Sequence, residues 1–244
     1  HNLLLTFGLS AVVLTAGILI SAAASRGTPK EKRPLVWFAC SFSNAGYMGF
    51  PLIRALFGTE GVLYASAFLT VFNILIFTAG TTVLSGQVDA RKIVRSIVTT
   101  PCILAVAAGL VIYLCRVPVP GTIAEPVGLV GDMNTPLSMI ITGITIASSD
   151  LKQLLRNPSL FRTLGVRMLL IPALGLGLFA LLGLHGTVPT IVLLLEACPC
   201  AAITTMLAIQ YRADEELAAG AVVFSTLSSI VILPLYALLL TAVL

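Results

Sequence analysis

Long runs of apolar residues alternate with short charged clusters along the whole chain. Each run is long enough, or nearly so, to cross about 30 Å of hydrocarbon as one α-helix. The runs number eight and cover residues 2–25, 34–57, 61–85, 99–115, 126–148, 161–184, 187–209 and 217–243. This pattern predicts an all-α polytopic membrane protein with eight spans in this chain.

Two of the predicted spans are interrupted near their middle. The second span contains Gly46, Gly49 and Pro51, and the seventh contains Pro199. Gly and Pro weaken helices, and freed backbone groups at membrane depth are tolerated only where protein or water meets them. Paired interruptions in two halves of a chain are the best sequence indication of a transporter's substrate site. We therefore expect two broken helices that cross.

The composition excludes a soluble domain. Of the 244 residues, 58% are hydrophobic and only 10% are charged, whereas soluble domains carry about 25% charged residues. The net charge of +4 is distributed over the membrane loops and gives no reason to expect a nucleic-acid partner.

The basic residues predict how the chain is oriented in the membrane. All but two of the 14 Lys and Arg residues fall at one end of the predicted spans, and only Arg54 and Arg116 fall at the other. Cytoplasmic loops carry an excess of Lys and Arg, so the first end is predicted to be cytoplasmic. Both ends of this chain are then extracytoplasmic, in the inner (plasma) membrane. The connection over 87–97 is predicted to be a basic amphipathic segment on the cytoplasmic leaflet.

An internal repeat relates the two halves of the chain. Leu217 follows Leu63 by 217 − 63 = 154 positions, and the same offset aligns Asn44 with Cys198. The two interrupted spans are an odd number of spans apart, so the copies are inverted, as in many secondary transporters. Two further helices are expected before His1, which would complete two repeats of five. The predicted units are residues 1–86, a linker over 87–98, and residues 99–244.

The first interruption is predicted to bind an anion. Asn44 falls near the bilayer midplane, and its amide can donate or accept a hydrogen bond. Gly46, Gly49 and Pro51 predict that the helix opens between Asn44 and Pro51. The half-helix after the break then begins with free N–H groups, a positive pole suited to an anion. The alternative is a glycine-kinked helix packed closely against a neighbour.

The second interruption centres on Pro199 and adds Cys198, Cys200 and Thr204. Because this copy is inverted, its second half-helix approaches the midplane from the opposite side, and two positive poles favour a carboxylate. A Cys-Pro-Cys sequence also suits a soft metal such as copper(I). We favour two small apolar thiols beside a kink, and we expect no metal site.

Three residues are candidates for coupling transport to a proton or another ion. Glu196 would cost about 2.5–3.5 kcal/mol near mid-span, and such carboxylates usually face the protein interior and mark ion paths. The alternative is a carboxyl neutralised by a hydrogen bond. Asp132 and Asn134 fall nearer the outer surface, where a capping role is an equal alternative. Arg167 is expected to snorkel to the cytoplasmic interface.

The sequence points to transport rather than to catalysis. It contains no nucleotide-binding, metal-ligand or hydrolase pattern, so neither an enzyme nor a cofactor is expected. The expected partners are a small organic anion, a proton or a sodium ion, and the lipid bilayer. A homodimer is left open.

The residues around the first break strongly resemble the fourth helix of the auxin efflux carrier family. The resemblance is carried by residues 44–52 (Asn-Ala-Gly-Tyr-Met-Gly-Phe-Pro-Leu) and 57–61 (Phe-Gly-Thr-Glu-Gly). Similarity to that family's seventh, ninth and tenth helices is carried by Pro136-Leu137 with Gly143, Cys198-Pro199, Leu207-Ala208 with Tyr211, Ser225-Thr226-Leu227 and Pro234-Leu235.

This resemblance implies ten helices in two inverted repeats, arranged as in bile-acid symporters and sodium–proton antiporters. It implies that substrate binds where the fourth and ninth helices cross, at Asn44, Pro51 and Pro199. Family members move organic anions, auxin in plants and mono- or dicarboxylates in bacteria, and the short connection over 86–98 is similar to bacterial members. We therefore predict a secondary active transporter. The alternatives are a cation-coupled symporter and a non-transporting membrane sensor on the same fold.

Overall fold

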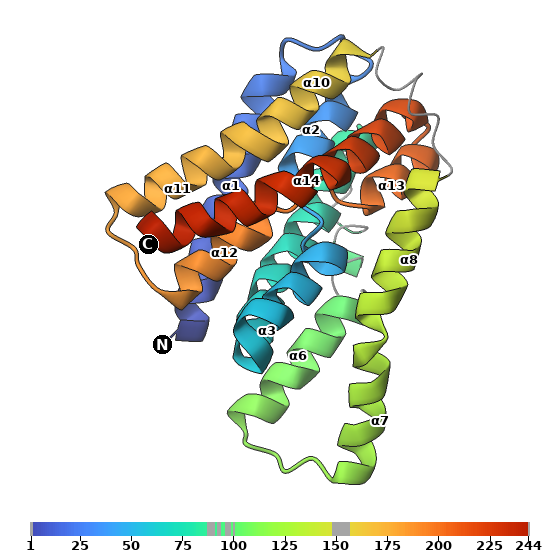
Figure 1. Cartoon of the computed structure of the whole chain (residues 1–244). Helices are drawn as coiled ribbons and strands as arrows, with labels where there is room; N and C mark the ends of the chain where they lie inside the picture. Colours follow the sequence, from blue (N-terminus) through green and yellow to red (C-terminus); the bar gives the residue numbers. More distant parts are fainter. Residues whose placement is uncertain are drawn as a thin grey trace.

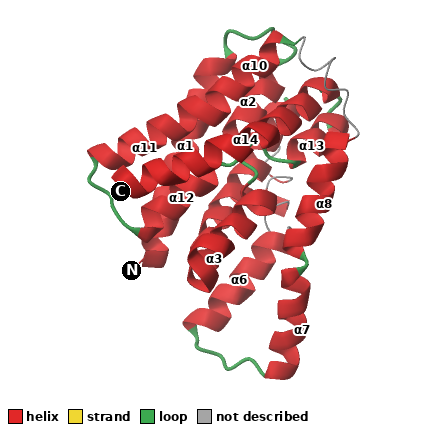
Figure 2. Ribbon diagram, viewed as in Figure 1, coloured by secondary structure: helices red, strands yellow, loops and turns green. Residues whose placement is uncertain are grey.

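A computed structural model describes residues 2–86, 101–147 and 157–243, together with residues 91, 94, 95 and 99. Most of the predicted connection over 87–97 lies outside these residues. The helices, most of which are labelled in Figure 1, are α1 (Asn2–Ser25), α2 (Arg33–Ser41), α3 (Phe50–Leu75), α4 (Thr81–Ser85), α6 (Pro101–Leu114), α7 (Gly121–Asp132), α8 (Asn134–Ala147), α10 (Pro158–Gly165), α11 (Ile171–Leu181), α12 (Thr187–Ala197), α13 (Ile203–Gln210) and α14 (Glu215–Val243), with π-helical segments η1 (Ala45–Gly49), η2 (Ile76–Gly80) and η3 (Val166–Leu170). Figure 2 shows the loops that join helices within the described ranges.

Within the described residues, four helical stretches are long and apolar enough to cross a membrane. They are Asn2–Ser25, Ala45–Ser85, Pro158–Leu181 and Glu215–Val243. The prediction of an all-α polytopic membrane protein is therefore confirmed, and three of the predicted spans correspond closely to long stretches. The boundary predicted between the second and third spans is a kink inside Ala45–Ser85. Gly58 makes this kink with φ 62° and ψ −153°, a conformation that favours glycine.

The remaining predicted spans are built from shorter helices. The fourth corresponds to α6, and the fifth to α7 and α8, which are separated at Met133. The second and seventh each divide into two pieces, as described below. The count of eight spans remains a prediction, because these helices do not reach spanning length individually.

Two of the connections that the charge pattern placed at one end of the molecule lie together within the described residues. Lys32 Nζ, after α1, pairs with Asp214 Oδ2, before α14, at 3.0 Å. Arg162 Nη1, in α10, lies 3.4 Å from Thr28 Oγ1. Both termini lie toward the opposite end (Figure 1). This grouping agrees with the predicted alternation of loops, while the side of the membrane that each end faces remains a prediction.

An aromatic cluster fixes α2 against α3. The ring centroids of Phe38 and Phe42 are 4.8 Å apart, and Phe42 meets Phe72 edge-to-face at 5.6 Å. Edge-to-face pairs contribute about 0.5–1.5 kcal/mol beyond the area that they bury. Gly80 completes the contact, since a Cβ there would lie 2.8 Å from Phe38 Cε2. The cluster therefore holds the end of α2 in place where the first break begins.

Candidate functional site

The first break follows α2 directly. Phe42 is extended, with φ −114° and ψ 122°, and the chain resumes as the π-helix η1 and then α3. The Asn44 carbonyl accepts hydrogen bonds from the N–H groups of Met48 (3.0 Å) and Gly49 (3.1 Å). Pro51 occupies the first turn of α3, where its missing N–H donor costs least. The break therefore lies at residues 42–44, and the prediction that the helix opens between Asn44 and Pro51 is wrong, because η1 and α3 continue as helix through Gly46, Gly49 and Pro51.

The second break follows α12. Cys198 leaves the helix with φ −57° and ψ 153°, and α13 begins at Ile203. The Cys200 N–H donates to Ser225 Oγ of α14 at 3.0 Å, so a side chain replaces the lost helical acceptor. The sequence pointed to Ser225 only through the family resemblance. A serine that is buried and faces a predicted break would have been the feature by which to predict its role.

The structure brings the two breaks together. The Asn44 N–H donates to Pro199 O at 2.7 Å, and the Ala201 N–H donates to Phe42 O at 2.9 Å. These bonds form an isolated antiparallel bridge between Ser43 and Cys200. Each break thus satisfies backbone groups that the other has freed, as membrane depth requires.

The bridge joins positions that are not equivalent in the predicted repeat. It pairs Ser43 with Cys200, whereas the repeat aligns Asn44 with Cys198. Two segments that cross in an antiparallel direction need not meet at equivalent positions, so the offset of 154 remains a prediction.

Most of the predicted substrate residues are buried at this crossing. Asn44 is 4% exposed, and Cys198, Cys200 and Thr204 are fully buried, while Gly46 and Pro51 are half-buried. Neither η1 nor α13 receives a capping hydrogen bond from a side chain. Among the described residues, Ser43 Oγ and Thr204 Oγ1 are buried without a hydrogen-bond partner. Buried polar groups of this kind call for a partner such as a ligand or water.

The prediction for the position of Arg167 is wrong. Arg167 does not snorkel to the interface but is fully buried, and its Nη1 pairs with Glu196 Oε1 at 3.0 Å. Its guanidinium also donates to the carbonyls of Cys198 and Cys40, so the carbonyls freed at the breaks hold it inside. An arginine in an apolar span is by default a sign of a functional site, and this signal was available in the sequence.

The other two ion-coupling candidates lie beside the first break rather than at the crossing. Asp132 Oδ1 pairs with Arg54 Nη1 of α3 at 2.5 Å, and both side chains are 57% exposed. Asn134 is the first residue of α8, the helix that packs against η1. Glu196 is therefore the ion-coupling candidate that lies at the crossing, where it pairs with Arg167.

The cysteines of the second break are packed as apolar side chains. Cys198 Sγ donates to Leu194 O of its own helix at 3.4 Å. Within the part of the chain that the structure describes, no group of three His, Cys, Asp or Glu side chains is placed to hold a metal ion. The contacts thus give the two thiols a packing role.

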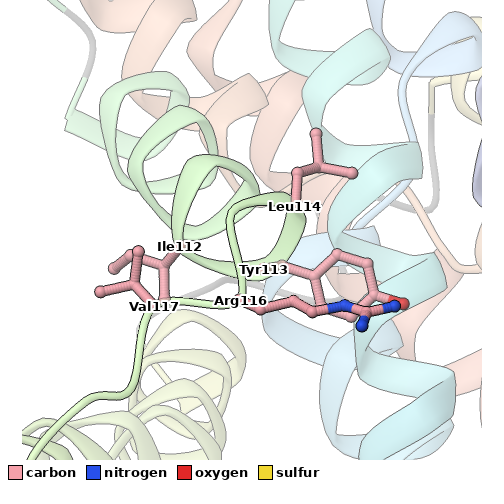
Figure 3. Close-up of a pocket in the computed structure, with 5 residues that line it drawn as sticks. All are labelled: Ile112, Tyr113, Leu114, Arg116 and Val117. Carbon is pink, nitrogen blue, oxygen red and sulfur yellow. The ribbon is translucent and has the colours of Figure 1, made fainter.

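A surface pocket occurs elsewhere, at the end of α6. Figure 3 shows its lining, with Tyr113 and Arg116 extending to one side of the helix end and Ile112 and Val117 to the other. All its lining residues come from this one helix end, and none belongs to either break. The crossing therefore remains the candidate site.

Comparison with known proteins gives two matches. The sequence matches the family described as "Membrane transport protein" over residues 2–237, a range that includes both breaks. It is also similar to an uncharacterized transporter of Methanothermobacter thermautotrophicus. The two sequences are 28% identical over 222 residues, which cover 89% of this chain and 72% of the archaeal protein.

Proposed function

We propose that this chain, which belongs to the membrane transport protein family that includes the auxin efflux carriers, is a secondary active transporter for small organic anions. Family membership makes it a multi-pass membrane transporter rather than an enzyme. The proposal adds a substrate class, mono- and dicarboxylates, and a mechanism, alternating access around the crossed breaks.

The proposal is based mainly on one observation. Two helices, η1 leading into α3 and α13, begin at the buried crossing, and neither has a side-chain cap. The first N–H groups of a helix have no partner within the helix, and together with the helix dipole they attract negative charge. Two such ends at one buried place favour a carboxylate.

The surrounding residues would give this anion its specificity. Asn44 would donate its amide to a carboxylate oxygen, and the unpartnered hydroxyl of Thr204 would donate from the other half-helix. Gly46 would let the substrate approach the backbone. Pro51, Pro199 and the thiols of Cys198 and Cys200 would shape the breaks and line them with small apolar groups.

The spacing of the helices supports the repeat, and we propose that its copies are inverted and that they move by rocking or in an elevator-like manner. The helix before the second break begins 187 − 33 = 154 positions after the helix before the first, which equals the offset read from the sequence. We propose that the two repeats lie in opposite orientations in the inner membrane, with both ends of this chain extracytoplasmic. The contact between Lys32, after α1, and Asp214, before α14, at the other end supports this orientation.

The coupling ion is the second part of the proposal. Glu196 is the coupling candidate that contacts the breaks, through Arg167, while Asp132 and Asn134 would act indirectly through α7 and α8. We propose a proton as the coupling ion, with Glu196 as the group on which coupling depends.

Transport by purified protein tests the proposal. The protein is reconstituted in proteoliposomes and tested for uptake of radiolabelled mono- and dicarboxylates. Asn44→Ala is expected to abolish uptake while leaving the folded yield unchanged. Asn73→Ala is the matched control, because Asn73 Nδ2 donates to Leu69 O within its own helix. Equal uptake by Asn44→Ala and the wild type would exclude the crossing as the substrate site.

A further inference from the structure

The Arg167 guanidinium holds four oxygen atoms of the two broken helices. Its Nε donates to Cys198 O at 3.1 Å, and its Nη1 donates to Cys40 O at 3.1 Å and to Glu196 Oε1 at 3.0 Å. Its Nη2 donates to Glu196 O. The side chain is fully buried. Three carbonyls and one carboxylate therefore surround a single permanent cation.

These acceptors share a position in the fold. Cys40 lies in the last turn of α2, Glu196 lies in the last turn of α12, and Cys198 directly follows α12. They mark the negative poles of the two half-helices that end at the crossing. In transporters with broken helices, such ends and unwound carbonyls coordinate a sodium ion or a proton. Carbonyl and carboxylate oxygens are also the ligands that hard cations take.

The helix that carries Arg167 has a local deformation at this residue. Arg167 belongs to the π-helical segment η3, between α10 and α11 in the stretch Pro158–Leu181. Single π-helical turns inside α-helices occur frequently at functional sites. On the other side of the pair, a Cβ at Gly17 of α1 would lie 3.1 Å from Glu196 Oε1, so a glycine leaves room for the carboxylate.

We propose that the Arg167 guanidinium is a built-in cation, which occupies the place at the crossing where a coupling sodium ion would otherwise bind. Guanidinium stays protonated in proteins, so the negative poles are neutralised throughout the transport cycle. Anion transport by this chain then needs no sodium. This inference rests on the proposed function, and it assigns Arg167 as a positioning residue for the two half-helices.

Sodium dependence of the wild-type protein is the first test. Carboxylate uptake into proteoliposomes is measured in sodium medium and in choline medium of equal ionic strength. The two rates are expected to agree within about twofold, because the guanidinium already neutralises the carbonyls. Uptake that requires sodium overturns the proposal.

Removal of the guanidinium is the second test. Arg167→Ala is expected to lower uptake about tenfold, because Glu196 loses its buried partner. Added guanidinium or sodium ions are expected to restore part of the rate. Arg162→Ala is the matched control, since Arg162 contacts Thr28 at the end of the molecule and neither break. A folded Arg167→Ala protein that neither ion rescues overturns the proposal.

Thermal unfolding in detergent gives a readout that needs no substrate. Sodium is expected to raise the Tm of Arg167→Ala but not that of the wild type or of Arg167→Lys, which keeps the charge. An equal rise in all three proteins overturns the proposal, even if none of the carboxylates proves to be transported. If Arg167→Ala does not fold, the wild type and Arg167→Lys decide the question, since a sodium-dependent Tm in either contradicts an occupied site.

Discussion

Gly49 of η1 packs directly against Leu195 of α12, so closely that a Cβ at Gly49 would lie 2.6 Å from Leu195 Cδ2 and 3.4 Å from Cys198 Sγ. Leu195 is fully buried. The absence of a side chain at Gly49 is therefore what lets the first break approach the helix that leads into the second.

Gly49→Ala is expected to destabilise the protein by about 1–3 kcal/mol, since overpacking a tight core costs this much. Gly46→Ala is the matched control, because nothing lies within 4 Å of a Cβ at Gly46. There the substitution should be neutral or stabilising by up to about 1 kcal/mol, from helix propensity alone. Unfolding of the two variants in detergent gives the comparison. Equal stability of both would show that the contact with Leu195 yields without cost.

Ser225→Ala removes the acceptor of the Cys200 N–H. A buried N–H left without a partner costs about 1–3 kcal/mol, so the variant should unfold earlier than the wild type. Ser229→Ala is the control on the same helix, because Ser229 Oγ donates to Thr226 O within α14. Its effect should be smaller than that of Ser225→Ala, because no backbone N–H loses its acceptor. Two variants with the same unfolding midpoint would indicate that another group replaces Ser225.

The sequence was sufficient to locate the regions of both breaks, because their helix-weakening residues fall at matching places in the two halves of the chain. It was not sufficient to show where the first break begins, because the chain leaves the helix at Phe42 and is helical again from Ala45, ahead of Pro51. The geometry at Gly58 was also not predicted. The sequence predicts a loop there, whereas the structure has a bend within a continuous helical stretch.

The burial of Arg167 could not be predicted from the sequence, for a different reason. Snorkelling is the usual outcome for an arginine near the end of a span. What holds it inside is a set of carbonyls from Cys40 and Cys198, which are distant in sequence and become acceptors only when both helices break. Their convergence is a tertiary feature, so no local pattern around Arg167 reports it.

Labelling of Cys115 tests the orientation of the chain. Cys115 is exposed, next to Arg116 in the loop between α6 and α7, which is predicted to be extracytoplasmic. A membrane-impermeant maleimide added to intact cells should therefore label the protein. In a protein in which Cys102 is already replaced by Ser, Cys115→Ser should abolish the labelling, because Cys40, Cys198 and Cys200 are buried. Labelling of the wild type only after the membrane is permeabilised would reverse the orientation.

Glu196→Gln tests the ion pair and the proposed coupling together. Removing one member of a buried pair costs about 3–5 kcal/mol, because the other charge is left uncompensated. The variant should be destabilised accordingly, and any uptake that remains should lose its dependence on pH. Asp132→Asn is the matched carboxylate control. Its pair with Arg54 is more than half exposed, and exposed pairs contribute at most about 1 kcal/mol.

The double variant Arg167→Gln with Glu196→Gln separates pairing from packing. With both charges removed, neither is buried alone, so the double variant should be more stable than the sum of the two single effects predicts. Strict additivity would mean that the two side chains do not interact across their 3.0 Å separation. An unchanged pH profile in Glu196→Gln, with transport retained, would instead remove Glu196 from coupling and leave it a structural partner of Arg167.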